Sequence, residues 1–142
     1  MPSLATRTFE RILLVKPSAV GDVIHAVPVL AKLRARYPAA RIDWLLTPAT
    51  ADLVGRHRAL SNVVLFDRNA YSRAWRSPSA AAGLARMIAA VRRTRYDLVL
   101  DLHGQFRSAL LVLASGAPVR VGFDRPRRAA VRGWAGAREG AW

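Results

Sequence analysis

One carboxylate in this sequence lies where a short apolar run gives way to a helix-like segment, in the stretch Lys16-Pro-Ser-Ala-Val-Gly-Asp22. The helix dipole stabilises negative charge at a helix start, so Asp22 has two possible roles: a helix N-cap, or a general base that accepts a proton. Gly21 permits a tight turn or a backbone with positive φ. The stretch has one glycine and lacks Gly-Lys-Ser/Thr, so it matches neither the dinucleotide-binding fingerprint nor the P-loop.

Three histidines, at positions 25, 57 and 103, are the other side chains suited to proton transfer. His25 follows Asp22 by one helical turn, and we expect it to pack or to form a structural hydrogen bond. His103 lies in Asp101-Leu-His-Gly104, where it would either line a ligand site or shape a turn. We expect Asp101 to hold that loop by hydrogen bonds. The spacing of the histidines fits no metal-binding motif, so no metal site is expected.

Positive charge is the most unusual property of the chain, whose formal net charge is +14. Only Lys16 and Lys32 are lysines, so 21 of the 23 basic residues are arginines. Residues 55–95 hold nine of these arginines and a single acid, Asp67. Such a field attracts the phosphates of nucleic acids, nucleotide sugars or anionic lipids, and arginine can bind phosphate or carboxylate with two hydrogen bonds. A solvated helix face is the alternative for one group: Arg86, Arg92, Arg93 and Arg95.

The elements that must position these residues are short β-branched runs that alternate with longer helical stretches. The expected strands are 11–16, 41–46, 63–66, 98–102 and 119–122, and the expected helices are 23–37, 50–55, 79–95 and 105–114. This alternation predicts an α/β fold, a Rossmann-like doubly wound parallel sheet with helices on both faces. Ligands bind outside the carboxyl ends of such strands. Function is therefore expected in the loops after Lys16, Leu46, Phe66 and Leu102.

The 142 residues, 52% of them apolar, suffice for one domain with its own core. We expect this domain over residues 1–122, followed by an irregular segment, 123–142, that holds Trp134 and Trp142. The chain has no cysteine, which excludes disulfides, thiolate zinc sites and cysteine nucleophiles. No uncharged stretch approaches the ~20 residues of a membrane span, and early charges leave no room for a signal peptide. We therefore expect a soluble, intracellular protein.

An ordered series of motifs resembles glycosyltransferase family 9, the lipopolysaccharide heptosyltransferases. Residues 11–28 are similar to the family's strand–K-x-S-S-x-G-D–helix pattern with a His and a Pro shortly after, except that Ala19 replaces the second serine. The other motifs follow in the family's order: Tyr37-Pro38, Ile42-Asp43-Trp44, Ser72-Arg73-Ala74-Trp75, Tyr96-Asp97, Asp101-Leu-His-Gly104 with Arg107-Ser108, Gly122-Phe123-Asp124 and Ala137-Arg138-Glu139-Gly140. Within the family, 43–44 and 72–75 are most similar to the heptosyltransferase I branch.

The resemblance implies a GT-B glycosyltransferase, built from two Rossmann-like domains that face each other across a cleft. This chain corresponds to the N-terminal, acceptor-side half, and the C-terminal domain that binds ADP-heptose is missing. The implied reaction is an inverting transfer of heptose from ADP-heptose to the Kdo/inner-core region of lipopolysaccharide, with Asp22 as the general base and no cofactor. The implied acceptor is lipid-linked Kdo–lipid A. The implied location is cytoplasmic, at the inner face of the inner membrane, in contact with its anionic surface.

The resemblance also implies which residues bind substrate. Ser18 and Gly21 belong to the loop near the donor phosphates, while Arg73 and Arg138 match basic positions that the family associates with the acceptor. His103 is a candidate for lining the acceptor site. Arg107 joins this set, and Arg68 and Arg76 are further candidates; a solvated surface position is the alternative for all three arginines.

Two alternatives stay open. The charge also permits a basic module that binds phosphate or nucleic acid without catalysis, but no helix-turn-helix, RNP or zinc signature accompanies it, so no specific nucleic acid is expected. The other alternative is a degenerate fragment without activity. Because donor binding would belong to the missing domain, we predict that this chain alone catalyses no transfer.

Overall fold

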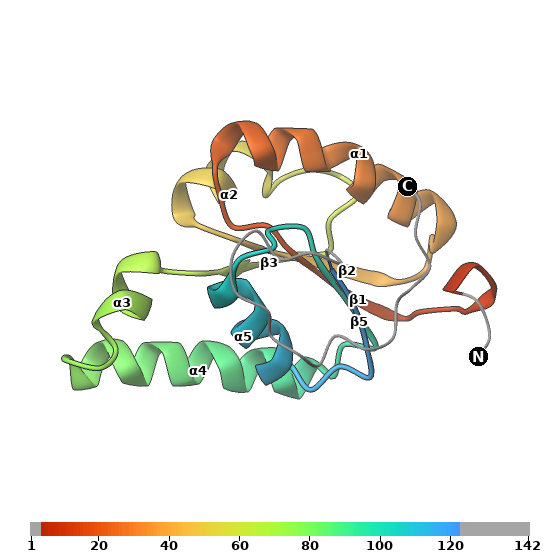
Figure 1. The fold of residues 1–142 in the computed structure, drawn as a ribbon. Coiled ribbons are helices and arrows are strands. Elements are labelled where there is room, and N and C mark those ends of the chain that lie inside the picture. Colours follow the sequence, from red (N-terminus) through yellow and green to blue (C-terminus); the bar gives the residue numbers. More distant parts are fainter. Residues whose placement is uncertain (1–3, 123–142) are drawn as a thin grey trace.

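The structure is a computed structural model that describes residues 4–122 (Figure 1). Its described strands form one five-stranded sheet in the order β3-β2-β1-β4-β5, and every neighbouring pair is parallel. The strands are β1 (Arg11–Val15), β2 (Arg41–Leu46), β3 (Asn62–Leu65), β4 (Leu98–Asp101) and β5 (Val119–Val121). This is the strand order of a Rossmann-like sheet, so the predicted fold class is confirmed.

Helices cover both faces of the sheet (Figure 1). The described helices are α1 (Val20–Arg36), α2 (Pro48–Val54), α3 (Arg68–Arg73), α4 (Pro78–Thr94) and α5 (Phe106–Ala114), after a 3-10 turn at Leu4–Thr6. Side chains alternate between the faces because a strand has a period of two. Ile12 and Leu14 pack in the cluster beneath α1 and α2, whereas Leu13 and Val15 pack with residues of α4 and α5. The central strands are therefore buried on both faces.

The start of the first helix differs from the expectation. It begins at Val20, so Gly21 is helical and does not adopt the turn or positive φ that a glycine permits. The N-cap is Ala19, whose side chain makes no cap hydrogen bond. Asp22 lies in the first turn of the helix and is not its cap.

A short helix, α3, was not expected between β3 and α4. Asp67 caps it, since its Oδ1 accepts the backbone N–H groups of Asn69 and Ala70 at 2.8 and 3.1 Å. Six residues are too few to show helical periodicity, so the cap residue was the signal available in the sequence. This helix directly follows the carboxyl end of β3.

A buried polar cluster lies within the sheet and joins two of the motifs found in the sequence. Asp43 is fully buried in β2 and accepts hydrogen bonds from the Tyr96 hydroxyl at 2.5 Å and from Arg41 Nε at 2.9 Å. Burial and the neighbouring carboxylate raise the pKa of Tyr96. Asp97 accepts the backbone N–H groups of Glu10 and Arg11, which fixes the start of β1. These motif residues therefore shape the sheet itself.

Candidate active site

The carboxyl ends of β1 and β4 lie side by side because Val15 pairs with Asp101 in the parallel register. β1 also pairs with β2, so the direction of the strand order reverses between β1 and β4. In doubly wound sheets this switch point opens the crevice in which ligands bind. The loops after β1 and β4 therefore meet where a binding site is expected.

Hydrogen bonds from β2, from α2 and from the residue between them hold the loop after β1 in place. Trp44, which is fully buried, donates its indole N–H to the carbonyl oxygen of Lys16 at 3.3 Å. The carbonyl oxygen of Pro17 accepts the Thr50 hydroxyl at 2.9 Å and the Thr47 backbone N–H at 3.2 Å. These three bonds present the start of α1 at the carboxyl edge of the sheet.

Asp22 is an exposed carboxylate beside a nearly buried ammonium group. Its Oδ2 lies 3.4 Å from Lys16 Nζ, and the side chains are 61% and 13% exposed, respectively. A Cβ added at Gly21 would meet nothing within 4 Å, so the surface next to Asp22 is open. An open carboxylate with a fixed cation beside it can accept a proton from an incoming hydroxyl.

A small pocket at this edge brings together three of the predicted site residues. Ser18, His103 and Arg107 all line it. The other lining residues are Pro17, Phe66, Arg68, Gln105, Ser108 and Leu111. The cavity of about 20 Å³ has room for one water-sized group, while its mouth carries two guanidinium groups. Its lining suits an anionic or hydroxylated ligand that rests on the opening.

Asp101 organises the loop after β4, as expected. Its Oδ1 accepts the backbone N–H groups of His103 at 2.9 Å and Gly104 at 3.1 Å. Its Oδ2 accepts the Ser108 hydroxyl at 2.9 Å. Gly104 has φ +66°, a conformation that favours glycine, and this lets the chain turn sharply around the carboxylate. Asp101 is 3% exposed, and the hydrogen bonds of this loop occupy its carboxylate, whereas the carboxylate of Asp22 is exposed.

His103 is held neutral at this site. Burial of the ring, and then the positive charge of Lys16, lower the pKa of His103 below its ordinary value of 6.5. Its buried Nδ1 has no hydrogen-bond partner within residues 4–122. Lys16 therefore acts on both Asp22 and His103, which belong to loops that follow different strands.

Arg73 and His25 do not line this pocket. Arg73 is exposed in α3, where its Nε donates to the Asn69 carbonyl oxygen at 3.3 Å, and it does not line the pocket. Arg138 lies outside the described residues. His25 is exposed on α1, so the expectation that it packs is wrong.

Sequence reasoning did not assign Lys16 and Gln105 to the site, and it named Arg68 only as a further candidate. Lys16 was visible as the first residue of the K-x-S pattern, but its contacts with two loops depend on strand order. Arg68 became a pocket residue because α3 begins directly above β3.

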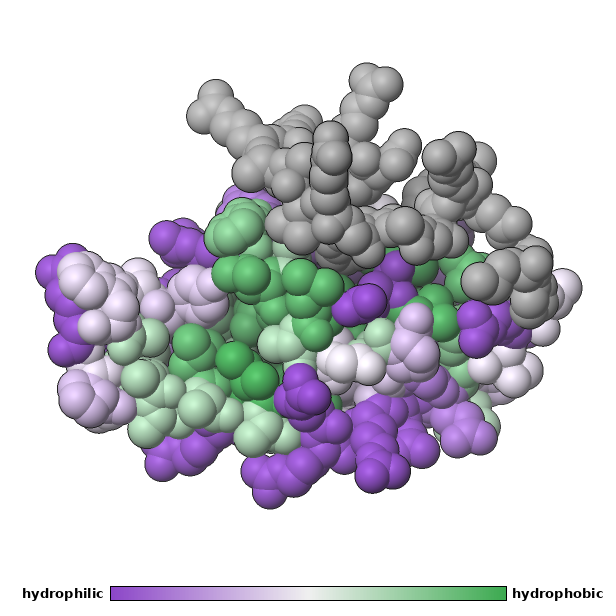
Figure 2. All heavy atoms as spheres, turned by 60° about the horizontal axis from the view of Figure 1, so that its bottom comes forward, coloured by the Kyte–Doolittle hydropathy of each residue, from purple (hydrophilic) through white to green (hydrophobic). Residues whose placement is uncertain are grey.

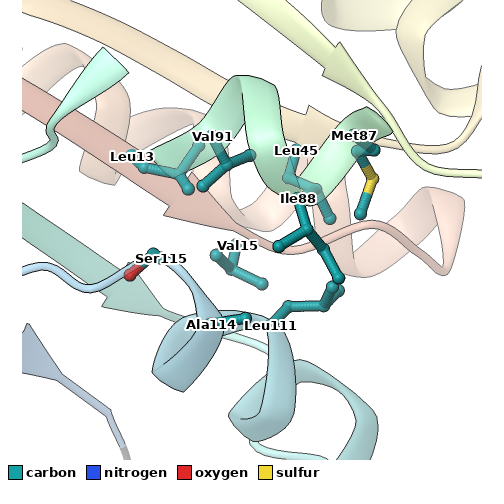
Figure 3. Close-up of a pocket in the computed structure, with 9 residues that line it drawn as sticks. All are labelled: Leu13, Val15, Leu45, Met87, Ile88, Val91, Leu111, Ala114 and Ser115. Atoms are coloured by element: carbon teal, nitrogen blue, oxygen red, sulfur yellow. The ribbon is translucent and has the colours of Figure 1, made fainter. Parts of the chain in front are cut away.

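A second cavity lies in the core between α4, α5 and the sheet, and it has no comparable chemistry. Figure 3 shows its side chains pointing toward one another. They are Leu13, Val15, Leu45, Met87, Ile88, Val91, Leu111, Ala114 and Ser115. The one hydroxyl, of Ser115, is satisfied because it donates to the Val112 carbonyl oxygen and accepts the Ala117 N–H. We therefore regard this cavity as a packing gap.

Two other kinds of site are absent from residues 4–122. No group of three or more His, Asp or Glu side chains there could hold a metal ion. No helix in that range combines the length and apolar character that crossing a bilayer requires.

The strand order, the open switch point and the basic pocket together define a Rossmann-like domain suited to anionic ligands. More specifically, residues 84–138 match the sequence pattern of glycosyltransferase family 9 (heptosyltransferase). Lipopolysaccharide heptosyltransferase 1 of Escherichia coli K12 is 31% identical over 114 residues, which are 80% of this chain and 36% of that protein. The Pseudomonas aeruginosa protein of the same name is 30% identical over 115 residues, 81% of this chain and 32% of that protein.

Solved structures agree with this assignment. The E. coli heptosyltransferase WaaC with ADP-2-deoxy-2-fluoro heptose superimposes with a TM-score of 0.74 at 30% identity, over 83% of this chain and 38% of that one. E. coli ADP-heptose lps heptosyltransferase II gives a TM-score of 0.62 at 28% identity, over 79% and 30%. The chain thus spans about a third of the length of the relatives it matches. The family resemblance and the match to part of a GT-B heptosyltransferase are confirmed.

Proposed function

We propose that this chain is the acceptor-side domain of an inverting heptosyltransferase that uses ADP-heptose and extends the Kdo/inner-core region of lipopolysaccharide. One observation carries the proposal: Asp22 is an exposed carboxylate, fixed beside Lys16, at the switch point of the sheet. Family membership, and the names of relatives that act on lipopolysaccharide and were solved with ADP-heptose analogues, support the choice of substrates.

In the proposed reaction, Asp22 takes the proton of an acceptor hydroxyl as that oxygen attacks the anomeric carbon of heptose. The new C–O bond forms on the face opposite ADP, the bond to the ADP oxygen breaks, and its electron pair leaves with ADP. The proton stays on Asp22 until solvent removes it. Lys16 orients the carboxylate through the 3.4 Å ion pair and thus acts as a positioning residue.

The other predicted residues divide between the two substrates. We propose that Ser18 and Gly21 face the donor phosphates at the start of α1, where free helix N–H groups favour negative charge. Arg73, Arg107 and Arg138 would bind the carboxylates and phosphates of Kdo–lipid A, since arginine suits both groups. His103, neutral and lining the pocket, would accept a hydrogen bond from an acceptor hydroxyl.

We further propose that residues 1–122 form this acceptor-side domain and that residues 123–142 lead toward a C-terminal donor-binding domain. On this view the chain alone turns over no ADP-heptose. It would work in the cytoplasm, at the inner face of the inner membrane. The relatives' greater length supports this proposal, since about two thirds of each has no counterpart here.

A second candidate is a basic module that binds phosphate or nucleic acid without catalysis, and the net charge of +14 favours it. Binding by such a module would follow counterion release, so it would fall steeply with salt and be similar for any polyanion. Saturable binding of Kdo–lipid A that survives excess heparin and is lost in Arg107→Ala or Arg138→Ala would favour the heptosyltransferase.

The decisive experiment measures release of ADP from ADP-heptose in the presence of Kdo–lipid A. We expect no turnover by the 142-residue chain and restored turnover by a hybrid enzyme, in which the chain replaces the matching part of E. coli lipopolysaccharide heptosyltransferase 1. Asp22→Asn in the hybrid should lower kcat by about 10²–10⁴-fold. Asp52→Asn, which changes an exposed carboxylate on α2, is the control and should leave kcat unchanged. A folded hybrid with near-normal turnover after Asp22→Asn would refute the proposal.

A further inference from the structure

An aromatic side chain is left in water at the turn between α3 and α4. Of the large apolar side chains that the structure describes, Trp75 is the most exposed, at 76%, and the next, Leu53 and Leu65, are each 57% exposed. The Arg76 guanidinium lies over the Trp75 ring, 4.2 Å from its centroid. An indole paired in this way has an apolar body and a polar, cationic rim, which is typical of residues that settle at a membrane–water interface.

The charge around Trp75 is one-sided. We define the α3–α4 corner as residues 68–78, which hold Arg68, Arg73 and Arg76 and no acid. The nearest acid in the sequence, Asp67, is occupied as the cap of α3. Within the described part of the chain, none of the three arginines forms an ion pair. Their charge is therefore available to an anionic surface, which attracts each such residue by about 1 kcal/mol.

The corner projects from the body of the domain. Figure 1 shows α3 and the first turns of α4 extending beyond the sheet, on the side where β3 ends and α1 begins. In Figure 2 hydrophilic residues lie at this end of the molecule and along the lower rim, while apolar residues gather in the middle of the face. A projecting tip with one exposed aromatic side chain and several cations suits a flat surface, whereas nucleic-acid recognition uses grooves or stacked aromatic platforms.

The corner is also joined to the candidate active site. The Tyr71 ring of α3 packs edge-on against the Phe66 ring, with 5.6 Å between their centroids. The Arg107 guanidinium lies 5.7 Å from the centroid of the Tyr71 ring. Phe66 and Arg107 both line the pocket of the site. A surface that binds the corner would therefore lie at a fixed position relative to the loops after β1 and β4.

We propose that Trp75 and Arg76, supported by Arg68 and Arg73, anchor the protein to an anionic lipid bilayer, with the carboxyl edge of the sheet turned toward the lipid headgroups. The indole enters the headgroup region, and the guanidinium groups contact lipid phosphates. The inference rests on the proposed function in one respect: a lipid-linked acceptor would then lie on the same side as Asp22. The anchor itself requires only the exposed indole and the unpaired charge.

The test is cosedimentation of the 142-residue chain with vesicles that contain no acceptor. Vesicles of phosphatidylcholine with 30 mol% phosphatidylglycerol are compared with pure phosphatidylcholine. We expect binding to the anionic vesicles, a partition coefficient about tenfold lower for Trp75→Ala, and most of the binding kept by Trp75→Phe. Arg76→Gln, as a separate variant, should also weaken binding to the anionic vesicles and reduce the dependence of this binding on salt. Circular dichroism would verify that each variant is folded.

Two substitutions away from the corner serve as matched controls. Leu53→Ala changes an exposed apolar residue of α2, and Arg58→Gln changes an exposed arginine between α2 and β3; both should bind vesicles like the parent chain. Equal binding by the parent and Trp75→Ala would overturn the anchor. Equal affinity for duplex DNA, with no effect of Trp75→Ala, would also overturn it and would indicate general affinity for polyanions. Binding of a delipidated Kdo saccharide tests the proposed function separately, and Trp75→Ala should leave that binding unchanged.

Discussion

Two carboxylates lie at the carboxyl edge of the sheet, one in the first turn of α1 and one at the end of β4, and the structure predicts opposite consequences for their removal. Asp22, after β1, is exposed and contacts Lys16, whereas Asp101, at the end of β4, is buried and accepts three hydrogen bonds. The perturbation is a matched pair, Asp22→Ala and Asp101→Ala. The first should leave the domain intact and abolish transfer, while the second should destabilise the domain itself.

The magnitudes follow from the contacts. Asp22→Ala removes an exposed ion pair, worth about 0–1 kcal/mol, and a first-turn dipole interaction of about 0.3–1 kcal/mol. The better helix propensity of alanine offsets about 0.5 kcal/mol of this loss, so the net change in unfolding free energy should stay below about 1.5 kcal/mol. Asp101→Ala removes three hydrogen bonds to a buried carboxylate at about 1–1.5 kcal/mol each, a total of about 3–4 kcal/mol.

Urea denaturation followed by circular dichroism separates the two cases. With an m value of about 1.5 kcal/mol/M, Asp101→Ala should lower the unfolding midpoint by about 2–3 M, and Asp22→Ala by less than about 1 M. Transfer by the hybrid enzyme is then measured where both variants are folded. A shift for Asp22→Ala as large as that for Asp101→Ala would show that Asp22 is structural and would refute the argument.

Four further substitutions test other parts of the structure. Gly21→Ala should raise the unfolding free energy by about 0.5–1 kcal/mol, because the glycine is helical with open space around it, and should weaken ADP-heptose binding to the hybrid enzyme; unchanged affinity would place the donor elsewhere. Tyr96→Phe should lower the unfolding free energy by about 1–3 kcal/mol, since buried Asp43 loses its hydroxyl donor; a smaller loss in urea denaturation would contradict the hydrogen bond. Because the pKa of His103 is lowered in the folded protein, the unfolded chain binds a proton at this residue more readily than the folded chain. The stability that neutral His103 contributes is therefore present above pH 6.5. It is lost as the pH falls through the pKa of the folded state. His103→Gln should reduce this acid-side decline, and Lys16→Met should raise the His103 pKa in an NMR titration.

The strands could be predicted from the sequence because the central ones are buried on both faces. Such strands are mostly apolar runs, as in Ile12–Val15 and in Arg41–Leu46 apart from Arg41 and Asp43, and they can be found without knowledge of their neighbours. Helix starts depend on weaker local signals. Ala19 is an N-cap without a side-chain hydrogen bond, so the sequence held no cap signal for the first turn of α1. The predicted start was three residues late for this reason.

The site was harder to predict than the fold, because its contacts join residues far apart in the sequence. Ser18 and His103 meet only because β4 pairs beside β1, which local patterns do not determine. Asp101 was an exception, since the carboxylate, the glycine and the serine that it organises lie within eight residues. Asp43 and Tyr96 stood out as motif residues, but only their contact reveals that they stabilise the sheet.

The geometry around Lys16 also argues for which group takes the proton in the proposed reaction. Protonation of His103 would place a second positive charge in a partly buried pocket beside the ammonium group, and the lowered pKa of His103 expresses that cost. Protonation of Asp22 instead neutralises an exposed negative charge and adds no cation to the pocket. A hydroxyl that approaches between the two loops should therefore transfer its proton to Asp22. His103 should only form a hydrogen bond with the substrate. Because the charge of Lys16 lowers the pKa of His103, replacement of Lys16 by methionine should make His103 easier to protonate.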